Sequence, residues 1–144
     1  GNKTIPYEVV IVAKDFDMVY PAMLANDGSL FLQFADQALR LTNKTKTFMN
    51  VTSISLYYNG DVATTKQTIE LAPQTTLDKP LPIGAIASSK IENESRYSKM
   101  TAGAARNNKV HYGFAIKYSL AGKQEKTLYQ VNDFNLYDVL IAKK

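Results

Sequence analysis

Apolar and polar residues alternate most clearly between residues 110 and 120. Large apolar or aromatic side chains fill every even-numbered position, and small, polar or charged side chains fill the odd ones. The even positions are Val110, Tyr112, Phe114, Ile116, Tyr118 and Leu120. Because successive side chains of a β-strand point to opposite faces, this pattern predicts a strand with one buried face. We expect the chain to turn at Ala121-Gly122 and to return over residues 126–131 as an antiparallel hairpin.

A second hairpin is predicted around the dipeptide Asn59-Gly60, which lies between two further alternating runs. Asn-Gly between alternating segments is the strongest short-range indication of a two-residue β-turn. Such a turn pairs Tyr58 with Asp61 and Leu56 with Ala63, and it places Ala63, Thr65, Ile69 and Leu71 on the same apolar face as Tyr58. Tyr57 then points to the opposite, more solvent-exposed face.

Three other segments are assigned from their composition. The run YEVVIVA, residues 7–13, is apolar on both faces and predicts a strand covered on both sides. Residues 29–42 predict two short strands with a bend near Asp36-Gln37, and a helix is the alternative. The C-terminal run FNLYDVLIAKK predicts either a final strand or a short terminal helix.

Residues 84–108 form a long segment that is rich in Ala, Ser, Asn and Gly and has no sustained period. A connection of this length is uncommon in a compact domain, and such loops are usually functional, mobile, or contain a short helix. We expect a long, mobile connection here. Its basic, aromatic and methionine side chains make it a candidate partner-binding segment. They are Arg96, Tyr97, Lys99, Met100 and Arg106.

The pattern as a whole predicts an all-β, mostly antiparallel fold in one domain, residues 1–144. About seven to nine short strands separated by turns indicate a β-sandwich, with a small barrel as the alternative. This succession of strands and turns, over most of the chain, is similar to that of the immunoglobulin-like and fibronectin-like accessory domains of exported bacterial proteins. The resemblance implies a sandwich that binds a partner.

Composition narrows the possible functions. The chain has no cysteine, which excludes zinc ribbons, iron–sulfur clusters and thiol catalysis. Its 17 Lys and Arg residues exceed its 13 Asp and Glu residues and give a net charge of +4. Only Arg40, Arg96 and Arg106 are arginines, and recognition of phosphate and guanine favours arginine, so we do not expect nucleic acid as a partner. The glycines form no phosphate-binding loop, and we expect no cofactor.

The start of the chain bears on its expected location. It opens with Gly1 in place of Met, which suggests a cloning or protease scar and a signal peptide or anchor that has been trimmed away. No apolar run approaches the roughly 18 residues that a membrane helix needs. We therefore expect a periplasmic, cell-surface or secreted protein that meets a membrane only through a removed N-terminal anchor.

Few residues are candidates for chemistry. His111 is the only histidine, so it cannot form a multi-histidine metal site, and we interpret it as a residue of the less apolar strand face. Asp15 and Asp17 flank Phe16 at the predicted end of the first strand and are weak candidates for a calcium site. The simpler interpretation of this pair is a solvated strand terminus. Tyr57 is a candidate anchor for a sugar ring or a protein partner, beside its ordinary interpretation as a cross-strand packing residue.

The favoured hypothesis is a non-enzymatic, extracytoplasmic binding module for a protein or glycan partner, acting through strand edges and the 84–108 segment. A small-ligand carrier with a barrel-like pocket is the alternative. A hydrolase that uses His111 or the two aspartates is a remote third possibility.

Overall fold

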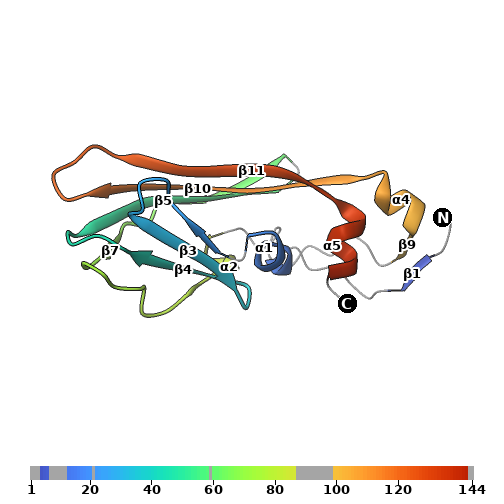
Figure 1. The fold of residues 1–144 in the computed structure, drawn as a ribbon, viewed down its shortest axis with the longest axis horizontal. Coiled ribbons are helices and arrows are strands. Elements are labelled where there is room, and N and C mark those ends of the chain that lie inside the picture. The colour runs from blue at the N-terminus through green and yellow to red at the C-terminus, as the bar shows by residue number, and fades with distance from the viewer. Residues whose placement is uncertain (1–3, 7–12, 21, 59, 87–98, 143–144) are drawn as a thin grey trace.

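The computed structural model describes residues 4–6, 13–20, 22–58, 60–86 and 99–142, and Figure 1 shows its ribbon. Its helices are α1 (Ala13–Val19), α2 (Ile83–Ile86), α4 (Ala102–Arg106) and α5 (Leu136–Ala142). Its strands before the Pro-rich segment are β1 (Thr4–Pro6), β2 (Ala22–Leu24), β3 (Leu30–Ala35), β4 (Ala38–Asn43), β5 (Met49–Tyr58), β6 (Asp61–Thr65) and β7 (Ile69–Leu71). The later strands are β8 (Leu81–Pro82), β9 (Lys99–Thr101), β10 (Lys109–Leu120) and β11 (Lys126–Asn135).

Two antiparallel sheets form the body of the molecule. One has the order β11-β10-β5-β6, with β7 also pairing with β5, and the other has the order β2-β3-β4-β8. They face each other as two layers, and β10 and β11 continue past them toward α4 and α5 (Figure 1). The mostly antiparallel β architecture is therefore confirmed. Among the strands described, the two sheets remain separate and do not close, so the barrel alternative is wrong.

The strand predicted over residues 110–120 is confirmed as β10. Its even-numbered residues from Val110 to Tyr118 are at most 3% exposed, while His111 and Lys117 on the other face are exposed. The hairpin partner β11 runs in unbroken antiparallel register from Lys109 opposite Asn135 to Tyr118 opposite Lys126. On its other side β10 pairs with β5, with one irregularity between Lys117 and Tyr118.

The hairpin predicted at Asn59-Gly60 and the two strands predicted over residues 29–42 are also confirmed. Tyr58 pairs with Asp61, as expected of a turn at Asn59-Gly60, of which Gly60 is described and has φ +87°. Residues 30–35 and 38–43 form the paired strands β3 and β4, not a helix. The two-residue turn between them has positive φ at both Asp36 (52°) and Gln37 (59°), which is the type I′ geometry that suits the twist of a hairpin.

The N-terminal prediction needs a correction. Residues 7–12 of the predicted strand lie outside the described part, and Ala13 begins helix α1 where the end of that strand was expected. Phe16 and Tyr20 lie four residues apart, on one side of a helical turn, and both are buried. A buried aromatic pair at this spacing stabilises a short helix against the sheets, and this tertiary contact overrides the local β pattern.

The 84–108 segment contains more regular structure than predicted. Its first residues complete α2, and after the undescribed residues 87–98 it forms β9 and α4. The Thr101 hydroxyl caps α4 by accepting a hydrogen bond from the Ala104 N–H at 3.1 Å. Strand β9 pairs with β1 as a separate two-stranded sheet. At the C-terminus, the short terminal helix that was one of two predictions is confirmed as α5.

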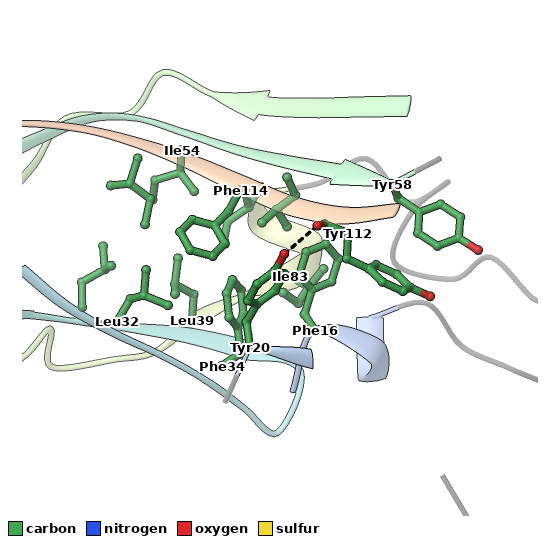
Figure 2. Packing of buried hydrophobic residues seen from close by; sticks show 14 of the residues in the cluster. Phe16, Tyr20, Leu32, Phe34, Leu39, Ile54, Tyr58, Ile83, Tyr112 and Phe114 are labelled. Atoms are coloured by element: carbon green, nitrogen blue, oxygen red, sulfur yellow. Dashed lines mark hydrogen bonds between the residues drawn. The ribbon is translucent and has the colours of Figure 1, made fainter. Parts of the chain in front are cut away.

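The core lies between the two main sheets, and Figure 2 shows its aromatic end. Phe16 of α1 packs against Phe34 of β3 and Tyr112 of β10, with ring centroids 5.4 and 5.6 Å apart. The Tyr20 hydroxyl donates a 2.8 Å hydrogen bond to the Tyr112 carbonyl, the dashed line in Figure 2. Tyr58 packs beside Tyr112 with a centroid separation of 5.0 Å. Helix α1 is thereby fixed across the end of the sandwich.

Candidate functional site

The outer face of the five-stranded sheet, opposite the core, carries an unusual set of side chains. The register places Tyr57 of β5, Gly113 of β10 and Val131 of β11 in one cross-strand row. The next row holds Ser55, Ala115 and Tyr129. Val62 of the neighbouring strand β6 lies opposite Tyr57. Tyrosine and valine side chains thus surround two small residues, and none of the helices that the structure describes covers this face in Figure 1.

The two tyrosines of this face touch across the small residues. The Tyr57 and Tyr129 rings are 6.1 Å apart between centroids and meet nearly edge to face, at 73°. Tyr129 is 62% exposed and Val62 is 56% exposed, whereas Ala115 beneath them is only 8% exposed. We call the surface formed by Tyr57, Val62, Gly113, Ala115, Tyr129 and Val131 the tyrosine face.

Gly113 is required by a close approach of β11. A Cβ atom on Gly113 would lie 2.5 Å from the Gln130 carbonyl oxygen and 2.7 Å from the Val131 Cα atom. Real Cβ atoms do not approach backbone so closely, so any side chain here would force the two strands apart. The Val131 side chain occupies the space beside Gly113, with its Cγ2 atom even nearer to where that Cβ would lie.

Polar pairs lie at both ends of the tyrosine face. The cross-strand pair His111–Asp133 is joined by a contact between the His111 Nδ1 and the Asp133 carboxylate, and both side chains are about half exposed, at 49% and 53%. At the other end Lys117 lies opposite Thr127, and both are exposed. With a rise of about 3.3 Å per residue, the strip from His111 to Lys117 is about 20 Å long.

A second polar cluster lies where the β2–β3 turn meets β11. The Asp27 carboxylate accepts hydrogen bonds from the Lys126 ammonium at 2.7 Å and from the Ser29 N–H at 3.0 Å. The same turn, Tyr118 and residues 126–129 line an open hollow of about 500 Å³, with Tyr129 as a common member of the hollow and the tyrosine face.

The charges of this cluster are fixed near neutral pH. The hydrogen bonds from Lys126 and Ser29 hold the pKa of Asp27 well below its usual range. The hydrogen bond and charge of Asp27 in turn raise the pKa of Lys126. A carboxylate that resists protonation and an ammonium that resists deprotonation are poorly suited to general acid–base chemistry, which needs a pKa near the working pH.

Asp15 and Asp17 occupy helix α1, so the premise that they share one side of a strand end is wrong. Because a helix turns about 100° per residue, two residues apart they point to nearly opposite sides of the helix. Asp15 is 1% exposed and accepts a hydrogen bond from the Tyr112 hydroxyl in the core. Asp17 accepts a 2.9 Å hydrogen bond from the Gln37 N–H of the β3–β4 turn. Within the described residues, no three His, Asp or Glu side chains gather as a metal site would require.

Burial raises the pKa values of two groups that join α1 to the sheets, the Asp17 carboxyl and the Tyr112 hydroxyl. It raises the pKa of Asp17, and the nearby Asp36 carboxylate raises it further, against the opposing effect of the Gln37 hydrogen bond. Burial, followed by the negative charge of Asp15, raises the pKa of Tyr112 far above its usual value. Both arrangements join α1 to the sheets, and we assign them a structural role.

The candidate residues of the 84–108 segment that the structure describes belong to elements away from the tyrosine face. Lys99 and Met100 belong to β9. Arg106, at the end of α4, places its guanidinium 4.0 Å from the centre of the Tyr137 ring of α5, a cation–π contact. Arg96 and Tyr97 lie outside the described residues. Of the predicted binding residues, Tyr57 is the one that the structure places on the tyrosine face.

Sequence reasoning did not single out Tyr129, Val62 or the His111–Asp133 pair. The predicted hairpin contained the necessary information, because an antiparallel return over residues 126–131 sets Tyr129 on the outer face, opposite Ala115. The partner of His111 could not be found in this way, since β11 continues four residues beyond the predicted strand.

A larger hollow of about 680 Å³ lies beside β7 and is lined by residues 67–72, 75–79 and 81. It opens to the surface, as does the hollow beside Asp27, so neither is the enclosed pocket that a small-ligand carrier requires. The larger hollow is lined by β7 and the residues around it, and the smaller by the β2–β3 turn and the first residues of β11. Each also reaches buried core side chains, Ile69 and Leu71 in the first and Tyr118 in the second.

Comparison with known proteins finds no matching family model, no similar curated protein and no similar solved structure. Across the residues that the structure describes, every helix is too short or too polar to cross a membrane. Conclusions about function therefore depend on the geometry of the chain itself.

Proposed function

We propose that this chain is a non-enzymatic binding module, an immunoglobulin- or fibronectin-like sandwich of an exported protein, that binds a glycan on its tyrosine face. The observation that carries the proposal is the exposed Tyr129 ring packed beside Tyr57 above Gly113 and Ala115. An aromatic side chain with 62% of its surface in water, on the outer face of a sheet, offers a large apolar area at little cost in conformational freedom.

The chemistry of the strip matches that of a sugar chain. One face of a pyranose ring consists mainly of C–H groups, which pack on an aromatic ring, while its hydroxyl groups need hydrogen-bond partners at the rim. The strip supplies such partners at one end in His111 and Asp133 and at the other in Lys117 and Thr127. A length of about 20 Å accommodates several sugar units in a row.

Two further features favour binding over catalysis. The Asp27 and Lys126 side chains are held in their charged forms, and Asp15 and Asp17 hold helix α1. The exported location remains part of the proposal and rests on the resemblance to accessory domains of exported proteins. A protein partner that covers Val62 and Tyr129 is the competing function, because both are exposed apolar side chains of the kind found at interfaces.

A glycan array, followed by calorimetric titration of the sugars it identifies, tests the proposal. We expect millimolar to micromolar binding to neutral oligosaccharides, and a loss of about tenfold or more when Tyr129→Ala removes the ring. The matched control is Phe48→Ala, which removes another exposed aromatic side chain, 50% exposed and at the opposite end of β5.

The outcomes separate the two functions. Binding that is lost in Tyr129→Ala and kept in Phe48→Ala supports the tyrosine face. Equal loss in both variants contradicts it. If no sugar binds but a captured protein partner is released by Tyr129→Ala, the tyrosine face is a protein-binding surface and the glycan proposal is wrong.

A further inference from the structure

Among the strands that the structure describes, β11 is a long edge strand of the five-stranded sheet. It has ten residues, and among the described strands it pairs only with β10. Its register with β10 has no irregularity, and its sequence, KTLYQVNDFN, has no proline. Proteins usually protect such an edge with bulges, prolines, inward-pointing charges or short strands, because unpaired backbone N–H and C=O groups bind other strands.

The charges on β11 lie toward its ends. Lys126 begins the strand and Asp133 stands near its end, while residues 127–132 are uncharged. Lys126 is already bound to Asp27, and Asp133 contacts His111. The central part of this edge therefore lacks the charged side chains that discourage pairing with another chain.

We propose that β11 pairs with β11 of a second copy of this chain, antiparallel, about a two-fold axis at Gln130. This pairing continues the five-stranded sheet of one copy into that of the other. The inference goes beyond the proposed glycan binding and does not depend on it, because it concerns the sheet edge and needs no ligand.

The side chains of β11 are self-complementary in this register. An axis at Gln130 places Tyr129 opposite Val131 of the partner subunit, so two apolar side chains meet on the outer face. Thr127 falls opposite Asp133 of the partner subunit, where a hydroxyl can donate to the carboxylate. Odd-numbered residues stay on the outer face in both copies, as a continuous sheet requires. No like charges are opposed.

The neighbouring registers of the same parity are less favourable. An axis at Tyr129 would bring Glu125, which precedes the strand, opposite Asp133 of the partner subunit and oppose two negative charges. An axis at Val131 would need Asn135 as a paired residue. Asn135 is committed elsewhere, since its side chain donates to the Arg106 carbonyl at 2.9 Å and accepts from the Tyr137 N–H at 2.9 Å. The Gln130 register pairs residues 127–133 of the two copies and does not need Asn135.

The dimer would extend the tyrosine face. Val131 of the partner subunit would lie beside Tyr129, and the two strips would be joined edge to edge across the axis. Two sugar-binding strips held in one continuous sheet would bind a repetitive glycan with greater avidity than one.

Charge substitutions at the axis test the proposal. Each copy contributes a Gln130 side chain at the two-fold, so Gln130→Lys opposes two positive charges and Gln130→Glu opposes two negative charges. We expect wild-type protein to dimerise in sedimentation equilibrium and each variant to bind its own copy at least about tenfold more weakly. An equimolar mixture of the two variants should recover the dimer, because opposite charges then meet. Gln33→Lys, an exposed change on β3, is the matched control.

The outcomes decide the question. Urea unfolding of each variant shows whether its monomer is still folded. Recovery of the dimer in the mixture shows that weaker association of each variant alone comes from the opposed charges and not from a loss of stability. Wild-type protein that stays monomeric up to about 1 mM, where even an interface worth roughly 4 kcal/mol associates, overturns the proposal. A dimer that survives both variants, or a mixture that does not recover, overturns it as well.

Discussion

Tyr57 and Tyr58 are neighbours in the chain, yet they belong to two different tyrosine pairs. Tyr58 points into the core, is 1% exposed and packs on Tyr112 with a centroid separation of 5.0 Å. Tyr57 points outward and meets Tyr129, 6.1 Å away and 62% exposed. Two tyrosines that are adjacent on β5 thus have different surroundings, because neighbouring residues of a strand point to opposite faces of the sheet.

The comparison separates stability from binding in this sheet. The inner pair lies among Phe16, Asp15 and the other core residues, where removing a ring leaves a cavity and an unpaired polar group. The outer pair covers only Gly113 and Ala115, and its ring surface remains in water. We therefore expect the inner pair to contribute mainly to the free energy of unfolding and the outer pair mainly to the affinity for a partner.

The largest effect on stability is expected from Tyr112→Ala. Loss of this buried ring should lower the free energy of unfolding by about 3–5 kcal/mol, as for other large aromatic residues in cores. Tyr112→Phe keeps the ring and loses the hydrogen bonds of its hydroxyl group, to Asp15 and with Tyr58, which should cost about 1–3 kcal/mol. Urea unfolding measures both. A cost below about 1 kcal/mol for Tyr112→Ala would place this ring outside the core.

Gly113→Val should have the next largest effect on the free energy of unfolding. Its Cβ would meet the Gln130 carbonyl and the Val131 Cα atom, so β10 and β11 must separate, at a cost of about 1–3 kcal/mol. Ser53→Ala, on the same face of β5, is the control and should change the free energy of unfolding by less than about 0.5 kcal/mol. If Gly113→Val is as stable as Ser53→Ala, the two strands are not as close as described.

Asp27→Asn should have a smaller effect that depends on pH. The folded pKa of Asp27 lies below its unfolded value, so the ion pair stabilises the fold above the unfolded pKa and is lost as the pH falls through the folded one. The urea midpoint of the variant should be slightly below that of wild type at pH 7. The difference between the two urea midpoints should narrow below about pH 4, where an ordinary aspartate becomes protonated. A gap that widens on acidification would contradict the assignment.

The smallest effect on stability is expected from Tyr129→Ala. Its ring is mostly in water, so the free energy of unfolding should change by no more than about 0.5 kcal/mol. Sugar binding should nevertheless fall by about tenfold or more. Thermal unfolding and titration of the same preparation measure both quantities. A large loss of stability without a loss of binding would reverse the roles of the two tyrosine pairs.

The strands that the sequence predicted correctly are those with one solvent-exposed face and one buried face. Residues 110–120 alternate without exception, and the turn at Asn59-Gly60 agrees with the alternation on both sides of it. In such segments the local pattern and the tertiary packing favour the same register, so the pattern suffices. Tyr57 was placed on the outer face for this reason.

The parts that could not be predicted depend on contacts between distant residues. Helix α1 is stabilised by Phe16 and Tyr20 against strands nearly a hundred positions away in the sequence, and its own residues resemble a strand end. The short α4 follows a capping threonine within a segment that has no hydrophobic period. The tyrosine face requires the exact pairing of four strands, β6, β5, β10 and β11, which alternation within each strand does not supply.

A titration of methyl-labelled protein with a bound oligosaccharide tests the division between the two faces most directly. Methyl resonances of Val62, Ala115 and Val131 lie on the outer face, and those of Val110 and Ile116 lie in the core of the same sheet. The account predicts that the first group shifts on saturation while the second stays in place. Shifts confined to Val110 and Ile116, or spread equally over both groups, would contradict it.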